Sequence, residues 1–266
     1  METFAEYILG ETNLVSKVEI AYYLSKKTGI YFDKSVLFKT EIARQFIEYM
    51  KLDVDENMLL TASLLCNCKK VNNAQKIGKL QTYAMEGALY LRELGFDKRF
   101  CKICEEVNRY SESNPRERES DILELVDQFG GMLLNRPERI GLQTEEAIVL
   151  LQHRNLKDVY NRYLHTFVEF VSEMDGIEIG EAGRTTTFKR LVKIFNETPD
   201  VKEFIKNIAY DYAPKVDTLV AHHRAGTSNN MFGMQTHNPN RALFSEETTK
   251  KIMGHMDKLN ANSNEE

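Results

Sequence analysis

The sequence lacks a long apolar stretch, a run of basic residues and a leader-like beginning. Nowhere do about 18 consecutive apolar residues occur, so we expect no membrane span. Residues 1–10 carry Glu2 and Glu6 in place of the basic and apolar segments of a signal peptide. The net charge is −5 and no run of Lys or Arg appears, which argues against an extended nucleic-acid surface. We therefore expect a cytoplasmic protein.

Cysteine is scarce, and its few positions are clustered. The four cysteines form two close pairs, Cys66 with Cys68 and Cys101 with Cys104. This spacing does not suit a secreted disulfide framework, which leaves reduced thiols or a metal site. Both pairs are predicted on helices and not on the knuckle loops that hold structural zinc. We favour small buried hydrophobic side chains over a zinc site.

The distribution of apolar residues predicts an all-α fold. A chain of 266 residues, 42% hydrophobic and 28% charged, is long enough to bury a sizeable core. Apolar residues recur at helical spacing along almost the whole chain, and period-two alternation is nearly absent. Helices are expected at about residues 36–50, 58–65, 82–94, 98–109, 122–129, 144–152 and 156–174, and again after residues 199 and 245.

Local signals place some of the helix ends. Asp53 followed by Glu56 predicts a capping box at the start of the second of these helices. Pro199 is expected at the first position of a later helix. The glycine pair 130–131 is expected to loosen or bend its helix, and residues 224–240 are expected to form an exposed loop.

Six short motifs follow one another between residues 64 and 147. They are Leu64-Leu65-Cys66-Asn67-Cys68-Lys69-Lys70, Tyr83–Leu91, Leu94-Gly95-Phe96, Ile122–Phe129, Asn135-Arg136-Pro137-Glu138-Arg139 and Thr144-Glu145-Glu146-Ala147. Their order and spacing resemble the HD-GYP subfamily of HD-domain phosphohydrolases over roughly residues 35–152. The resemblance implies an HD-domain-like helical bundle with additional C-terminal helices. The expected division is an N-terminal helical segment, a degenerate HD-GYP-like domain, a C-terminal helical region and a disordered tail, at residues 1–34, 35–152, 153–259 and 260–266.

The same resemblance identifies what the chain has lost. Active HD-GYP proteins hold two or three metal ions with His and Asp side chains, and the metals generate a hydroxide that attacks a phosphodiester. Residues of other types stand at most of the ligand positions, namely Phe38, Cys66, Asn67, Tyr83 and the region of Asn108. Only Asp127 remains, with Lys70 near it in the pattern. One carboxylate cannot assemble such a site, so the resemblance implies the fold and argues against the reaction.

We therefore expect a catalytically inactive regulatory module that acts by binding. The expected ligand is an unidentified protein partner or a cyclic dinucleotide such as cyclic di-GMP, and a homo-oligomer is compatible with the sequence. No catalytic residue, metal ligand or cofactor is assigned. The candidate ligand-binding residues are Lys70, Asp127, Arg136 and Arg139. Each also has a structural alternative, since Asp127 could brace helices, Lys70 could lie at a helix end, and the arginines could pair with nearby acids.

The alternative is an active enzyme with a rebuilt metal site. Such a phosphohydrolase would combine Asp127 with cysteines or with distant histidines. The histidines concerned are His222, His223, His237 and His255. Their spacing fits no metal-site template, so we favour the inactive module.

Overall fold

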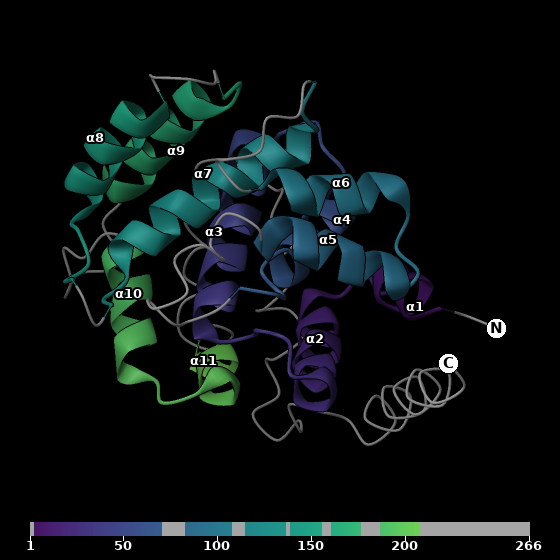
Figure 1. Cartoon of the computed structure of the whole chain (residues 1–266). Coiled ribbons are helices and arrows are strands. Elements are labelled where there is room, and N and C mark those ends of the chain that lie inside the picture. Colours follow the sequence, from purple (N-terminus) through teal and green to yellow (C-terminus); the bar gives the residue numbers. More distant parts are fainter. Residues whose placement is uncertain are drawn as a thin grey trace.

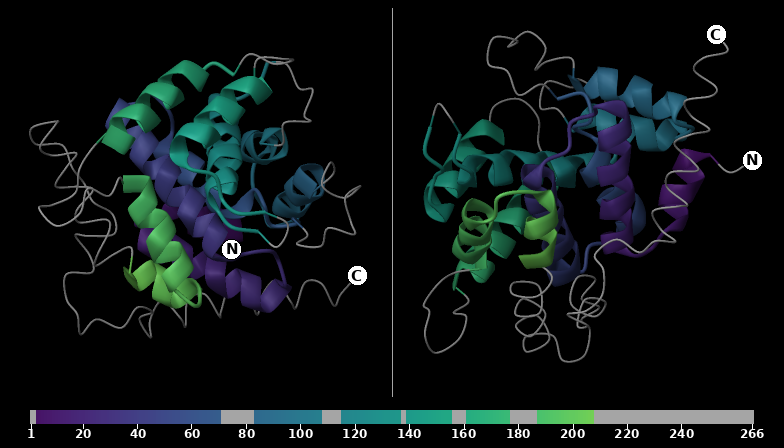
Figure 2. Two further views of the ribbon diagram at one scale, coloured as in Figure 1. Left: turned by 90° about the vertical axis from the view of Figure 1, so that its left-hand side faces the viewer. Right: turned by 90° about the horizontal axis from the view of Figure 1, so that it is seen from below.

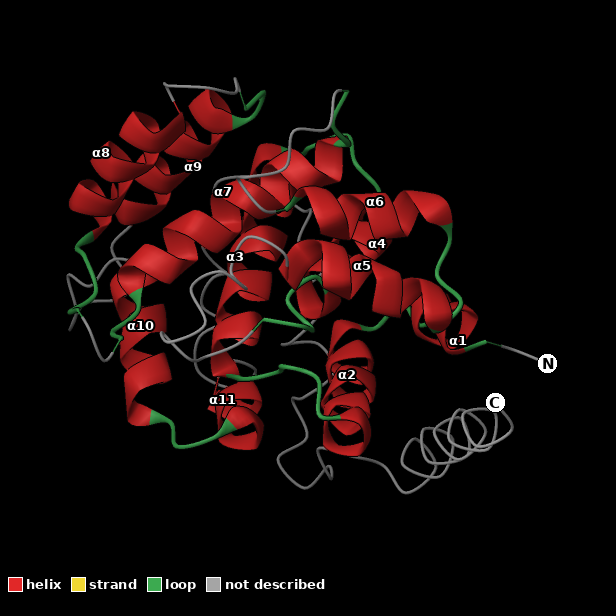
Figure 3. Cartoon of the chain, viewed as in Figure 1, coloured by secondary structure: helices red, strands yellow, loops and turns green. Residues whose placement is uncertain are grey.

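The chain folds into a bundle of helices (Figures 1 and 3). The computed structural model describes residues 3–70, 83–107, 115–136, 139–155, 161–176 and 187–207. The helices in this part of the chain are α1 Phe4–Gly10, α2 Leu14–Thr28, α3 Lys34–Met50, α4 Glu56–Leu65, α5 Tyr83–Glu93, α6 Lys98–Glu106, α7 Arg118–Leu133, α8 Thr144–Asn155, α9 Leu164–Gly176, α10 Thr187–Glu197 and α11 Val201–Asn207. These residues contain no strand, which confirms the predicted all-α fold. None of these helices is both long and apolar enough to cross a membrane.

Helix α3 lies at the centre of the bundle, with α4, α7, α9, α10 and α11 packed around it (Figures 1 and 2). Its apolar side chains are buried, and so are polar ones that amphipathic spacing would place outside. Arg44, 1% exposed, donates to both carboxylate oxygens of Glu41 at 2.8 and 3.0 Å and to Glu48 at 2.6 Å. Arg44 thus forms ion pairs with two acids of its own helix, which lowers the cost of burying it in the bundle.

The start of α4 differs from the prediction. The side chain of Asp55 caps this helix by accepting a hydrogen bond from the Met58 amide at 2.9 Å. The predicted capping box with Asp53 is therefore wrong. Lys51 adopts a left-handed conformation, with φ of 50°, at the end of α3. The turn after Lys51 places Asp53 two residues before Asp55, the N-cap residue of α4.

Two later helices also begin further along the chain than predicted. The prediction of one continuous helix over about residues 156–174 is wrong, because residues 161–163 are not helical and α9 begins at Leu164. Before it, the Asn161 side chain accepts from the Tyr163 amide at 3.0 Å and donates to the Asp121 carbonyl at 2.8 Å. Helix α11 begins at Val201, so Pro199 precedes its first turn. The Asp200 side chain accepts from the Glu203 amide at 3.0 Å and caps this helix.

Helices on both sides of residue 153 share one hydrophobic core. The ring of Phe46 on α3 lies 4.9 Å from that of Phe167 and 5.1 Å from that of Phe170, measured between centroids. Lys34, at the start of α3, donates to the carbonyl of Phe195 at 2.7 Å and also to that of Thr198. This lysine satisfies carbonyls at the end of α10, so the C-terminal helices are tied to the first turn of α3.

Several predictions concern residues outside the part of the chain that the structure describes. They are the exposed loop at 224–240, the helix after 245, the tail at 260–266 and the four distant histidines. The region of Asn108 also lies outside the described residues.

Candidate functional site

The surviving carboxylate, Asp127, lies on α7 opposite α3. Lys39 of α3 places its Nζ 2.6 Å from Asp127 Oδ1. The lysine side chain is 8% exposed and that of the aspartate 22%, so water screens this ion pair only in part. The contact joins residues 88 positions apart in the sequence. A lysine ammonium therefore occupies the approach to Oδ1 of this carboxylate.

Two residues of the turn after α4 contact the same carboxylate oxygen. Asn67 Nδ2 donates to Asp127 Oδ1 at 3.2 Å, and Lys70 Nζ lies 3.6 Å from it. Backbone hydrogen bonds hold the turn, including one from the Lys70 amide to the Asn67 carbonyl at 2.8 Å. The turn thus brings Asn67 and Lys70 to the surface of α7. The ring of Tyr83 adds a contact, with its centroid 5.5 Å from Lys70 Nζ.

The glycine pair of α7 lets cationic side chains approach that helix closely. A Cβ added at Gly130 would lie 2.9 Å from Lys39 Cγ, and one added at Gly131 would lie 3.0 Å from Arg136 Nη2. Helix α7 continues without interruption to Leu133, so the pair does not end it. The absence of two side chains instead makes room for the stem of Lys39 and the guanidinium of Arg136. We refer to Lys39, Asn67, Lys70, Asp127 and Arg136 as the Asp127 cluster.

The electrostatics of the cluster favour ionised side chains. Burial raises the pKa of the Asp127 carboxyl, but Lys39 and Lys70, with the hydrogen bonds from Lys39 and Asn67, lower it well below its usual range. Burial lowers the pKa of Lys70. Asp127 opposes that shift, while Lys39 and Arg136 add to it. Arg136 is therefore close enough to act on the Lys70 ammonium.

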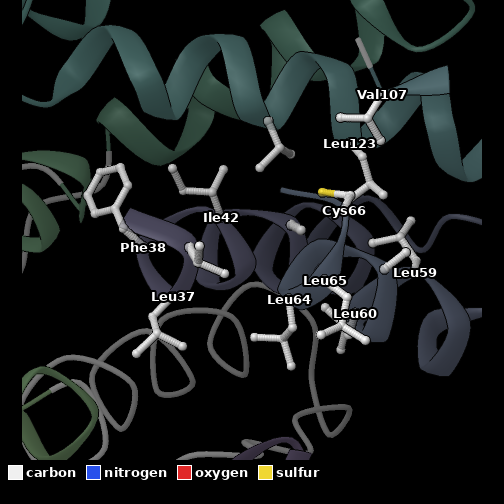
Figure 4. Packing of buried hydrophobic residues seen from close by; sticks show 14 of the residues in the cluster. Leu37, Phe38, Ile42, Leu59, Leu60, Leu64, Leu65, Cys66, Val107 and Leu123 are labelled. Atoms are coloured by element: carbon white, nitrogen blue, oxygen red, sulfur yellow. The ribbon is translucent and has the colours of Figure 1, made fainter. Parts of the chain in front are cut away.

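Cys66 begins the turn and points into the core, not toward a ligand. Figure 4 shows its sulfur among apolar side chains between the end of α4 and α7. Burial is the main cause that raises the pKa of this thiol to about 12, and Asp127 raises it further. All four cysteines are buried and unpaired by disulfides, and burial raises the pKa of Cys68 to about 12 as well. A metal would have to deprotonate these buried thiols, because the thiolate is the ligand.

The residues of this region do not fit the metals that the family resemblance implies. A cation that coordinated Asp127 Oδ1 would have to displace the ammonium groups of Lys39 and Lys70. Within the described ranges, no three His, Cys, Asp or Glu side chains are grouped in a way that could hold a metal ion.

The four predicted ligand-binding residues separate into two kinds. Lys70 and Asp127 are in contact, and Arg136 lies near Lys70. Arg139 has a structural role, because its guanidinium donates to the carbonyls of Gly131 at 2.5 Å and Met132 at 3.0 Å. These carbonyls belong to the last turn of α7, so Arg139 caps that helix.

Sequence reasoning missed Lys39. The family resemblance places the residue directly before it, Phe38, at a lost metal-ligand position. The structure places Phe38 in the core, with its ring centroid 5.7 Å from that of Phe195. Lys39, one position further, points to Asp127 instead. Spacing along α3 did not predict this, because the partner lies on another helix. Asn67 was recognised only as a lost ligand, although it still contacts the carboxylate.

A second group of charges lies at the other end of α7, around a cavity of about 480 Å³. Its arginines are Arg99, Arg116, Arg118 and Arg162, and its acids include Asp53, Asp55, Glu117, Glu119, Asp121 and Glu124. Arg116 lies 2.5 Å from Glu124, and Arg162 lies 2.7 Å from Asp121. We call this group the arginine cluster. Acids match or exceed the cations, so it joins helices and offers no unbalanced charge.

No family model, no curated protein and no solved structure matches this chain. The likeness to HD-GYP proteins therefore rests on the order of the motifs and on the residues that occupy them.

Proposed function

We propose that the chain is a catalytically silent, HD-GYP-like regulatory module that acts by binding. The ligand is a phosphate-bearing molecule, for which the family resemblance suggests a cyclic dinucleotide, or a protein partner. The observation that carries the proposal is the contact of Lys39 with Asp127. A buried ammonium satisfies the carboxylate that a hydrolytic site would need for metal.

The cationic character of the Asp127 cluster favours a phosphate-bearing ligand over a protein partner. Lys39 and Lys70 contact a single described carboxylate, and the guanidinium of Arg136 lies against Gly131 on the same helix. Lysine and arginine are the side chains that bind phosphate oxygens most often in proteins. Phosphodiester hydrolysis would further need an activated water, and the described residues of the cluster include no histidine that could activate one.

The test combines metal analysis with an activity assay. Protein purified without chelator is expected to contain far less than one transition metal per chain. It is also expected to leave cyclic di-GMP intact in the presence of added manganese or iron. Stoichiometric metal together with turnover that Asp127→Ala abolishes would support the alternative, a phosphohydrolase with a rebuilt metal site. That result would overturn the proposal.

Calorimetric titration with cyclic di-GMP tests the ligand directly. Binding that weakens in Lys70→Met would support recognition at the Asp127 cluster. Unchanged binding in this variant would place the ligand elsewhere on the chain and would contradict the proposed site.

A further inference from the structure

The charges of the Asp127 cluster do not balance. Lys39 and Asp127 form an ion pair at 2.6 Å and cancel each other. In the described part of the chain no other acidic side chain pairs with Lys70, and none pairs with the guanidinium of Arg136. Two positive charges therefore remain beside α7, one of them on a side chain only 18% exposed. Partly buried charge of this kind is costly unless a counter-charge meets it.

The two unbalanced cations lie on the same stretch of α7. Lys70 is held against Asp127, and the guanidinium of Arg136 lies against Gly131, one helical turn further along. Lys70 comes from the turn after α4, and Arg136 comes from the segment that follows α7. A point charge and a planar fork of donors therefore lie about one helical turn apart along α7, and both groups suit phosphate oxygens.

A neighbouring atom indicates a further ligand group. Asn67 is 3% exposed, and its Oδ1 is buried without a hydrogen-bond partner. Its Nδ2 donates to Asp127, which fixes the orientation of the amide because the reverse would set two oxygens against each other. The unused acceptor belongs to the amide that contacts Asp127, and it requires a donor. A hydroxyl close to the phosphate would supply one.

We infer that the Asp127 cluster binds the dianionic phosphate of a hydroxyl-bearing phosphomonoester, such as a sugar phosphate or a nucleoside monophosphate. Lys70 and Arg136 bind the phosphate oxygens, and Asn67 Oδ1 accepts a hydrogen bond from a hydroxyl of the ligand. A phosphomonoester carries a charge of about −1.5 to −2 at pH 7, which matches two cations. Each phosphodiester of a cyclic dinucleotide carries one negative charge and leaves one cation unmatched. The inference rests on the proposed binding function and names the ligand class of that site.

The experiment is calorimetric titration of the full chain with three probes, inorganic phosphate, ribose 5-phosphate and cyclic di-GMP. Ribose 5-phosphate is expected to bind most tightly, followed by inorganic phosphate, which lacks the hydroxyl for Asn67. Lys70→Met and Arg136→Met are each expected to weaken ribose 5-phosphate binding by about tenfold or more, because each removes a charged donor.

Lys69→Met is the matched control. Lys69 is the neighbour of Lys70, but its Nζ lies over the ring of Tyr90, 4.0 Å from the centroid, and makes no contact with Asp127. This variant changes the net charge as Lys70→Met does, so its affinity for ribose 5-phosphate is expected to stay within about twofold of the parent protein. An equal loss in both variants would indicate a long-range charge effect and would overturn the inference. Melting temperatures without ligand show whether each variant is folded.

Asp127→Asn removes the acid of the cluster, whereas Lys70→Met and Arg136→Met each remove a cation. Removal of the carboxylate leaves three cations, so a dianion is expected to bind at least as tightly as in the parent. The rise in melting temperature on adding inorganic phosphate is expected to be larger. A smaller rise than in the parent would show that Asp127, not the excess of cations, governs binding, and this result would overturn the inference.

The outcomes separate this inference from the proposed function. If cyclic di-GMP binds in a manner that depends on Lys70 while neither monoester probe binds, the inference is wrong and the proposed module stands. If no probe binds, the inference is also wrong, and protein binding becomes the remaining form of the proposed function. If the protein turns over cyclic di-GMP with bound metal, both fail.

Discussion

The two ends of α7 carry charge clusters that differ in how their charges are balanced. At its start, each arginine of the arginine cluster meets one or more acids. Arg116, for example, lies 2.9 Å from Asp121 and 2.5 Å from Glu124. Toward its end, the Asp127 cluster holds three cations and a single described carboxylate, which Lys39 and Lys70 contact. A balanced cluster stabilises the bundle, whereas an unbalanced one keeps a charge available for a ligand. The balance between acids and cations in a cluster therefore says more about its role than the mere presence of charged residues.

The largest expected effect lies in the balanced cluster. Arg116→Met leaves Asp121 and Glu124 buried with fewer partners, and we expect it to lower the free energy of unfolding by about 3–5 kcal/mol. Arg118→Met is the control, because Arg118 is 57% exposed and contacts only exposed Asp53. Its expected cost is about 0–1 kcal/mol. Urea unfolding measures both. Equal costs would show that burial does not distinguish these arginines.

Lys17 differs from the cations of both clusters, because it is buried against neutral oxygen acceptors. Lys17 on α2 is 1% exposed, and its Nζ donates to the Ile8 carbonyl at 2.6 Å and to Thr61 Oγ1 at 2.8 Å. Burial lowers the pKa of Lys17 to about 8, although Glu11 and Asp55 oppose the shift. The unfolded chain binds the proton more tightly, so stability from this group rises as pH increases from about 8 to 10.5. The gain is about 3 kcal/mol.

The measurement is chemical unfolding of the parent and of Lys17→Met across this pH range. A comparison is needed because burial raises the pKa of Tyr31 and Cys66, whose titration works in the opposite direction. The difference in unfolding free energy between the two proteins is expected to increase with pH. Exposed Lys26 on the same helix is the control, and Lys26→Met is expected to show no such dependence. A flat difference for Lys17→Met would contradict the prediction.

The contact of Lys39 with Asp127 is expected to contribute less, because Asp127 retains Lys70 and Asn67. Lys39→Met should lower the free energy of unfolding by about 2 kcal/mol. The double variant Lys39→Met with Asp127→Asn should cost less than the sum of the two single changes. Additive costs would mean that the two side chains do not stabilise each other.

The acid dependence of the same contact has a defined sign. The pKa of Asp127 is lower in the folded chain than in the unfolded one. Its stabilisation is therefore complete above about pH 4 and is lost as pH falls below that value. Asp127→Asn is expected to reduce the acid sensitivity of unfolding.

The smallest effects are expected from the two glycines of α7. Gly130→Ala places a Cβ against the buried stem of Lys39, so overpacking should outweigh the helical gain and destabilise the protein by about 1 kcal/mol. Gly131→Ala meets only the end of the exposed Arg136 side chain, and it should stabilise by about 0.5–1 kcal/mol. It should also weaken ribose 5-phosphate binding, because the guanidinium must move. Thermal unfolding and titration of both variants measure these effects. Equal signs in stability would contradict the distinction.

The spacing of apolar residues predicted the position of most helices correctly. The apolar stripe from Val36 to Met50 coincides with most of α3, and the helix predicted from Lys98 begins there as α6. The errors arose where side chains compete to cap a helix, as Asp53 and Asp55 do, or where one turn interrupts an apolar pattern, as Asn161 does before α9. Each depends on one or two hydrogen bonds that residue spacing does not reveal.

The site was less predictable than the fold, for a physical reason. The family resemblance selected Lys70 and Asp127, which are in contact, and Arg136, which is close. It gave no indication of Lys39, since an ion pair between two helices leaves no periodic signal in either. It also did not distinguish Arg136 from Arg139, although one lies beside Lys70 and the other caps α7. Three positions apart in the sequence, they differ only in what surrounds them.

The central position of α3 has a consequence during synthesis. Phe46 is fully buried, but the rings that cover it, Phe167 and Phe170, lie about 120 residues later in the chain. The carbonyls that Lys34 satisfies are later still. A ribosome therefore releases α3 before α9 to α11 exist to cover it, and the nascent chain leaves apolar side chains such as Phe46 without these partners meanwhile. Chaperone binding to stalled chains that end before residue 160 should be strong, and it should decline once α9 to α11 have emerged.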